Sequence, residues 1–170
     1  MDFEKICEQR FSVRSFSDTP VEDEKIERIL QMVRKAPTAR NNQPYEIFYA
    51  KTPKGIEKLL PARDNYFGAP LVFLICSIDE KHWCNRQSGR EFTGQDIGII
   101  ATTLMYASAE LGLGSLYVCA FDPIKAKECL NLEGLTPECM MLVGYPSEDA
   151  TPSAMHSSRR QIEEFAHEIK

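Results

Sequence analysis

The stretch from Asp96 to Leu111 constrains the fold more than any other part of the chain. A helical stripe at intervals of three and four residues runs through it: Ile97, Ile100, Ala101, Leu104, Ser108 and Leu111. Ile99, Met105 and Ala109 are also apolar or small, and they lie on other sides of the same helix. A helix that is apolar on several sides must be covered on all of them. We therefore predict a central helix, packed between other elements and ended near Gly112.

Helical and extended segments alternate along the rest of the chain. Apolar runs predict strands at 45–50, 71–77, 115–121 and 138–144, while amphipathic or capped segments predict helices at 19–36, 52–60 and 122–130 and a short one after Arg159. Thr19 and Glu22 are predicted to form a capping box around Pro20. Residues 79–94 are polar without a clear period, so we expect a mobile or partner-dependent stretch there. Without repeats or hairpin turn signals, this interleaving favours an α/β or α+β fold with a mixed central β-sheet flanked by helices.

Size and composition indicate a single domain over residues 1–170. The content of 43% hydrophobic and 26% charged residues is typical of a folded protein with a real core. The net charge of -5 argues against a general binder of nucleic acid or anionic membrane. The N-terminus is charged, and no stretch reaches the roughly 18 apolar residues that a membrane span needs. We expect a cytoplasmic protein whose basic site is local and suited to a small anion.

The cysteines favour reduced, buried thiols. No C-x-x-C pair occurs, and several cysteines lie inside apolar runs: Cys7, Cys76, Cys84, Cys119, Cys129 and Cys139. His82 and Cys84 lie close in sequence but have no second pair of ligands nearby, so we predict no metal site.

The N-terminal segment reads RFSVRSFSD from residue 10. If it is extended, alternation places Arg10, Ser12 and Arg14 on one face, with Phe11 and Val13 on the other. Two guanidinium groups and a hydroxyl suit a phosphate, because guanidinium pairs with phosphate oxygens through charge-assisted hydrogen bonds. The alternative interpretation is a solvated N-terminal segment without a ligand.

The usual catalytic templates are missing from the sequence. It contains no G-x-S-x-G elbow, no Walker loop and no G-x-G-x-x-G after a strand. The cysteines have no histidine at a recognised spacing, so thiol nucleophile chemistry lacks support. A chain with so few catalytic side chains is expected to take its chemistry from a cofactor.

Six segments, in order along the chain, resemble the FMN-dependent nitroreductase family: Arg10–Phe16, Ala36–Tyr45, Asp96–Ser115, Phe121–Pro123, Leu142–Pro146 and Arg159–Glu164. The resemblance extends from about residue 6 to residue 168. It implies a nitroreductase-like α+β fold in which two subunits form an intertwined homodimer with FMN in the interface. Dimer contacts would also cover a central helix that is apolar all round.

Position by position, the resemblance implies which residues hold the cofactor. Arg10, Phe11 and Ser12 fall in the segment that binds the phosphate and ribityl chain of FMN. Arg159 corresponds to a C-terminal basic residue on the same phosphate, and Arg160 is placed to share that role.

Three further residues would face the flavin ring. Arg14 falls where the family places a cation beside flavin N1 and the C2 carbonyl, where it would stabilise the anion of reduced flavin. Cys119 and Ala120 resemble the turn whose backbone N–H groups face N5 and O4. The Cys119 thiol either excludes water there or is simply a buried core thiol. No side chain is expected to act as a catalytic acid, since the chemistry takes place on FMN.

The loop after the first long helix completes the implied site. Thr38, Asn41 and Gln43 match positions that reach FMN, commonly from the other subunit; alternatively, the two amides only satisfy the loop backbone. The chain has Arg40 where the family usually has glycine and Tyr45 where it usually has tryptophan. Arg40 either points to solvent, pairs with an acid across the interface, or narrows and charges the substrate pocket.

The function implied is that of an FMN-dependent oxidoreductase. NADH or NADPH would give hydride to flavin N5, and a nitroaromatic, quinone or activated alkene would then accept it. One alternative is a flavin-binding carrier or sensor without efficient turnover. Another is a structural domain whose N-terminal arginines bind an acidic protein.

Overall fold

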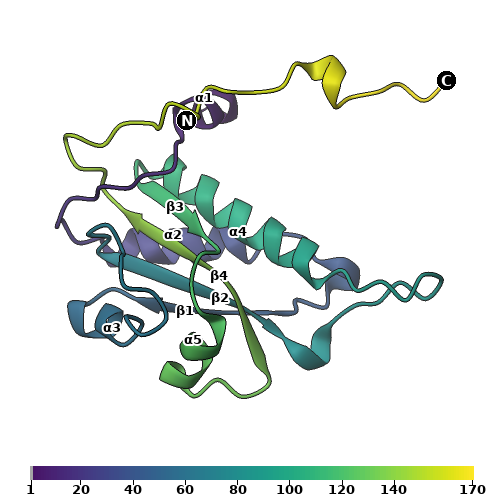
Figure 1. Cartoon of the computed structure of the whole chain (residues 1–170), viewed down its shortest axis with the longest axis horizontal. Helices are drawn as coiled ribbons and strands as arrows, with labels where there is room; N and C mark the ends of the chain where they lie inside the picture. Colours follow the sequence, from purple (N-terminus) through teal and green to yellow (C-terminus); the bar gives the residue numbers. More distant parts are fainter. Residues whose placement is uncertain (1) are drawn as a thin grey trace.

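The computed structural model describes residues 2–170, in which four strands form one sheet in the order β1-β2-β4-β3 (Figure 1). The strands are β1 (Tyr45–Ala50), β2 (Leu71–Ile78), β3 (Gly114–Val118) and β4 (Leu135–Gly144). All three strand pairs are antiparallel. The parallel component of the expected mixed sheet is an isolated bridge between Ser12 and Ser115, next to β3. The α+β class is confirmed, with a largely antiparallel sheet.

Helices cover both faces of this sheet. They are α1 (Phe3–Gln9), α2 (Asp23–Val33), α3 (Pro53–Glu57), α4 (Thr93–Glu110) and α5 (Pro123–Leu130), with 3-10 turns η1 (Ala39–Asn41), η2 (Asp79–Lys81) and η3 (Ile162–Glu164). Two of the predicted helix starts are confirmed by their caps. The Thr52 hydroxyl accepts a hydrogen bond from the N–H of Gly55, and the Asp122 carboxylate accepts from those of Ile124 and Lys125.

The predicted capping box at the start of α2 is wrong. The helix begins at Asp23 rather than beside Thr19, and the side chain of its N-cap residue, Glu22, makes no capping hydrogen bond. That carboxylate instead accepts a hydrogen bond from Tyr145, 123 residues away in sequence. A tertiary contact has therefore replaced the local one.

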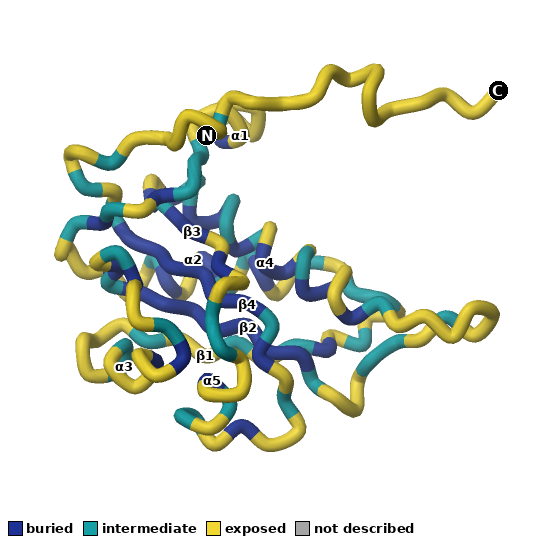
Figure 2. Tube along the Cα trace, in the orientation of Figure 1, coloured by how far each residue is buried: buried dark blue, intermediate teal, exposed yellow. Residues whose placement is uncertain are grey.

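The core has two compartments, one on each side of the sheet. On one side, α2 and α4 pack on alternate residues of β2 and β4, such as Phe73 and Met141. On the other side, Leu74 and Met140 pack with α5 and the 59–69 segment. From Leu71 to Ser77, β2 is buried on both faces (Figure 2), as its continuous apolar run predicts.

The central helix is not covered all round within the single chain. Ile99 on α4 is 39% exposed, and Tyr117 on the adjacent strand β3 is 46% exposed. In the other half of the helix, Tyr106 contacts Phe3 of α1, which is itself 62% exposed. One side of α4 therefore lacks cover from the residues that the structure describes.

Two segments project from this body in Figure 1. Within residues 79–94, an isolated bridge joins Cys84 to Glu91, and the rings of Trp83 and Phe92 lie 5.4 Å apart, so the stretch folds back on itself as a hairpin-like arm. The C-terminal arm runs away from the sheet and carries only the turn η3, where a helix is predicted. Its apolar residues are all exposed: Met155, Ile162, Phe165 and Ile169.

All six cysteines are free, but only some are buried. Cys76 and Cys139 are buried as predicted, and burial raises the pKa of each thiol to about 12. Cys7, Cys84 and Cys119 are exposed, which corrects the prediction for them, and Cys129 is intermediate. Apolar neighbours in the sequence did not imply burial at the ends of elements.

Native protein is expected to expose Cys7, Cys84 and Cys119 to an aromatic disulfide reagent, while Cys76 and Cys139 react only after denaturation. Because the fold favours the neutral form of the two buried thiols, stability should fall as pH rises from about 9 towards about 12, where the unfolded thiols ionise first. Counting the aromatic thiolate that the reagent releases with and without urea checks which thiols are accessible. Five or six equivalents released at once from native protein would contradict it.

Candidate functional site

The N-terminal segment is held against β3 by one close backbone approach. The Val13 N–H donates to the Ser115 carbonyl at 3.0 Å, and the Val13 side chain is buried. A Cβ added to Gly114 would lie 2.6 Å from Cγ2 of Val13, so only glycine fits there without displacement. With Val13 pointing inward, its neighbours Ser12 and Arg14 point outward, as the alternation predicts.

The chain that follows is fastened to the end of β4. The Ser17 N–H donates to the Tyr145 carbonyl at 2.9 Å, and the Ser147 N–H donates to the Ser15 carbonyl at 3.1 Å. An antiparallel bridge also joins Phe16 to Pro146. These contacts fix the position of the segment from both sides.

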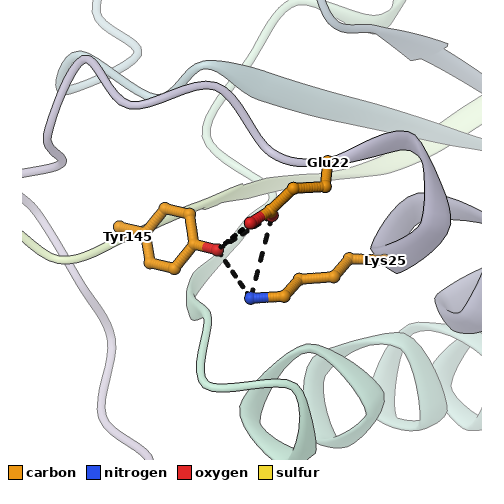
Figure 3. Close-up of polar contacts among 3 residues, drawn as sticks. All are labelled: Glu22, Lys25 and Tyr145. Carbon is orange, nitrogen blue, oxygen red and sulfur yellow. Dashed lines mark hydrogen bonds and ion pairs between the residues drawn. The ribbon is translucent and has the colours of Figure 1, made fainter.

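A cluster of Glu22, Lys25 and Tyr145 reinforces this junction (Figure 3). The Lys25 ammonium donates to the Tyr145 hydroxyl at 2.6 Å, and that hydroxyl donates to the Glu22 carboxylate at 2.8 Å. A backbone hydrogen bond at Glu22 and the Tyr145 hydroxyl lower the pKa of the Glu22 carboxyl. The hydrogen bond to Tyr145 raises the pKa of Lys25. Both charged forms are favoured, so α2 and the end of β4 are joined by charge-assisted hydrogen bonds.

The predicted basic face forms a real hollow of about 200 Å³. Its lining combines the N-terminal segment with the start of the C-terminal arm: Arg10, Ser12, Arg14, Ser153, Met155, His156 and Arg159. No carboxylate is among these residues. Three guanidinium groups and two hydroxyls therefore present hydrogen-bond donors with no carboxylate in the described lining to neutralise them, which fits a phosphate group.

Two residues predicted for this site lie beside it. The Arg160 guanidinium stacks over the Phe165 ring at 5.5 Å and does not line the hollow. The ring of Phe11 meets the edge of His156, with 6.4 Å between the centroids, and lines a neighbouring hollow of about 180 Å³ that shares Arg10. Phe11 thus supports the wall of the site without facing into it.

Sequence reasoning missed Ser153 and His156, which line the same hollow. The stretch rich in Pro, Ser and Thr before Arg159 has no periodicity, so it reads as a plain connection. The available signal was the placement of a hydroxyl and an imidazole within six residues of a predicted phosphate ligand.

The loop around η1 is held largely by its own groups. The Thr38 hydroxyl accepts from the Gln43 N–H at 3.0 Å, and the Gln43 amide donates to the Asn41 carbonyl at 3.3 Å. Arg40, Asn41 and Gln43 have φ values of 54°, 56° and 49°. Such left-handed backbone favours glycine, yet this chain has Arg40, Asn41 and Gln43 there. The Arg40 side chain is exposed.

A single chain does not bring this loop to the arginine hollow. The loop contacts the first turn of α4, where the Ala39 N–H donates to Asp96 at 2.9 Å. The arginine segment lies beside Gly114 and Ser115, just after the other end of α4. The helix has 18 residues, so about 27 Å separates its two ends. The two sets of predicted ligands therefore lie at opposite ends of one helix.

Cys119 and Ala120 follow directly after β3 and are exposed. The interpretation of Cys119 as a buried core thiol is therefore wrong. The Ala120 carbonyl accepts a hydrogen bond from the Arg63 guanidinium, and the Cys119 carbonyl accepts from the Phe121 N–H at 3.0 Å, so the turn is fixed.

Within residues 2–170, no helix is long and apolar enough to cross a membrane. In the same range, no three potential metal ligands of the His, Cys, Asp or Glu type gather in one place. Nδ1 of His82 lies 3.1 Å from the Glu91 carboxylate, within the projecting arm.

Comparison with known proteins points to one family. The model of the nitroreductase family matches residues 7–65 and 60–145. A solved nitroreductase family protein from Clostridium difficile 630 is 34% identical, with 98% of each chain covered and a TM-score of 0.90. A 4-nitrobenzoate reductase of Pseudomonas putida is 24% identical over 98% of this chain and 95% of its own length.

Other similarities are partial or more distant. A putative NADH dehydrogenase/NAD(P)H nitroreductase from Streptomyces coelicolor is 48% identical over 50 residues, which is 29% of this chain and 25% of that protein. An FMN reductase [NAD(P)H] of Bacillus subtilis is 26% identical over 81% of this chain and 63% of its own length.

Proposed function

Because the chain belongs to the nitroreductase family, we propose that it is an NAD(P)H-dependent oxidoreductase with FMN as its cofactor. The acceptor is a nitroaromatic, a quinone or an activated alkene. The observation that carries the proposal is the hollow in which Arg10, Ser12 and Arg159 converge with no acid among them. The similarity to an FMN reductase and to a 4-nitrobenzoate reductase supports the cofactor and one class of acceptor.

We assign the chain's own residues to binding and electrostatics. Arg10, Ser12 and Arg159 hold the phosphate of FMN through charge-assisted hydrogen bonds. Arg14, on the same lining, supplies positive charge that favours the more negative reduced form of the cofactor. When bound, FMN supplies the two-electron redox chemistry, and the protein supplies position and charge.

We propose that the complete site needs a homodimer. Thr38, Asn41 and Gln43 are at the far end of α4 from the arginines of the same chain, so their expected contacts with FMN require a second subunit. Two observations support such an interface. One side of α4 is uncovered at Ile99, and the C-terminal arm, which runs away from the sheet in Figure 1, carries exposed apolar residues. A cytoplasmic location stays a prediction.

Anaerobic titration of the FMN-loaded protein with NADH and with NADPH tests the activity. We expect the visible flavin absorbance to bleach with one or both nucleotides and to return when a quinone is added. Protein that binds FMN but is not reduced would instead be a carrier or sensor. Protein that takes up no FMN would contradict the whole proposal.

A further inference from the structure

Asp96 is a buried carboxylate with an unusual set of contacts. It lies in the first turn of α4 and is 4% exposed. Its Oδ1 accepts a hydrogen bond from the Ala39 N–H at 2.9 Å, while its Oδ2 is buried without a hydrogen-bond partner among the described residues. A buried carboxylate with one hydrogen bond is costly to desolvate, so this residue destabilises the fold unless its one hydrogen bond offsets that cost.

The carboxylate does not serve as a cap for its own helix. The N-cap residue of α4 is Phe92, which makes no side-chain capping bond, and Asp96 directs its bonded oxygen to a different segment of the chain. The negative charge is still favourable in the first turn of a helix, because it faces the positive end of the helix dipole. The helix dipole therefore stabilises the carboxylate, and the loop makes a hydrogen bond to it.

The loop around η1 has a strained backbone, which contacts with other segments must keep in place. Three of its residues, Arg40, Asn41 and Gln43, adopt left-handed backbone conformations without being glycine. Each such residue stores strain of order 1 kcal/mol or more, which persists only where the surroundings enforce it. Other outward contacts are longer: the Asn42 amide donates to the Lys81 carbonyl at 3.3 Å, and the Pro44 carbonyl, just after the loop, accepts from the Ile78 N–H at 3.0 Å. The bond from Ala39 to Asp96 is shorter and is made to a buried, charged acceptor.

We propose that Asp96 is a positioning residue for the flavin site: it fixes the strained loop so that Thr38, Asn41 and Gln43 present their polar groups to the cofactor. This inference rests on the proposed function. The loop ligands serve the flavin ring and ribityl chain, whereas Arg10 and Arg159 serve the phosphate. Loss of the Asp96 carboxylate therefore weakens the binding of FMN and of riboflavin by the same factor.

The experiment compares four proteins by equilibrium titration with FMN and with riboflavin: wild type, Asp96→Ala, Asp96→Asn and Ser108→Ala. Asp96→Ala is expected to bind both flavins at least about tenfold more weakly, since it removes a hydrogen bond to a charged acceptor. Asp96→Asn keeps an oxygen acceptor in place and should retain most of the affinity. Ser108→Ala is the matched control, because Ser108 is buried on the same helix and its hydroxyl donates to the Leu104 carbonyl of that helix at 2.9 Å.

A second variant keeps the test valid if Asp96→Ala does not fold. Ala39→Pro deletes the N–H that Asp96 accepts, leaves α4 unchanged, and places proline at the first position of η1, where it is tolerated. It should reproduce the loss for both flavins. The inference is overturned if folded Ala39→Pro binds both flavins as tightly as wild type does. It is also overturned if a variant loses affinity for FMN but not for riboflavin, or if Asp96→Asn loses as much affinity as Asp96→Ala. Wild-type protein without flavin affinity would instead defeat the proposed function itself.

Discussion

Replacement of both Arg10 and Arg159 by alanine is expected to weaken FMN binding by a factor of about 10² to 10⁴. Each guanidinium lines the phosphate hollow, and a hydrogen bond to a charged group contributes about 1.5–3 kcal/mol. Two lost interactions give about 3–6 kcal/mol, which corresponds to that range. Riboflavin, which has no phosphate, should bind the variant as well as it binds wild type. Fluorescence titration with both flavins measures the difference.

Arg34→Ala provides the matched control for this loss. Arg34 is an exposed arginine at the end of α2, hydrogen-bonded to Gln31 at 3.2 Å and absent from the hollow. Its replacement removes one positive charge, as the replacement of Arg10 or Arg159 does. It should leave FMN affinity within about twofold at physiological salt, because distant surface charges are screened. An equal loss of affinity per arginine in the control and in the double variant would mean that general charge, and not the hollow, attracts FMN.

Phe73→Ala is expected to lower the free energy of unfolding by about 3–5 kcal/mol. Phe73 is fully buried on β2, a central strand that is covered on both faces, and its ring lies 5.8 Å from that of Tyr49. A truncated side chain would leave a cavity that neither the sheet nor the α2 and α4 layer can collapse to fill. Urea unfolding followed by circular dichroism gives the value.

Phe73→Leu is the control for cavity formation, because it keeps most of the volume and should cost less than about 2 kcal/mol. Equal stability of the alanine variant and wild type would show that the sheet is not packed between two layers as described. Since domains of this size are stable by only about 5–15 kcal/mol, the alanine variant should also lose flavin at elevated temperature.

Strands and caps could be predicted where the local signal was strong. The bounds of β1 agree with the predicted range, because Pro44 and the Thr52-Pro53 pair punctuate the chain on either side. The Asp122 cap and α5 were likewise predictable, since the capping carboxylate and the proline act within one turn. These elements depend on interactions over two to four residues.

Features that depend on distant residues could not be predicted. Glu22 has the spacing of a capping residue, but Tyr145 takes its carboxylate from the other end of the sequence. The arm between Trp83 and Phe92 lacks periodicity because its residues do not line a core. Cys119 follows an apolar run yet lies past the end of the strand, where it is exposed.

The candidate site was predictable only where local patterns determine it. Alternation alone placed Arg10, Ser12 and Arg14 on one face, and the resemblance supplied Arg159. No local rule distinguishes Arg159, which faces the hollow, from Arg160, which stacks on Phe165. The contact between Asp96 and Ala39, on which the proposed positioning role rests, spans 57 residues and is visible only in the fold.

Subunit complementation tests the central claim, that one flavin site combines the arginines of one chain with the loop of another. One variant carries Arg10→Ala and Arg159→Ala, and the other carries Asn41→Ala and Gln43→Ala. Each alone should bind little FMN. After the two are mixed through reversible unfolding, half of the dimers are expected to be mixed, each with one intact site, so about a quarter of all sites should regain FMN. No recovery in verified mixed dimers would place both sets of ligands in one chain and contradict the account.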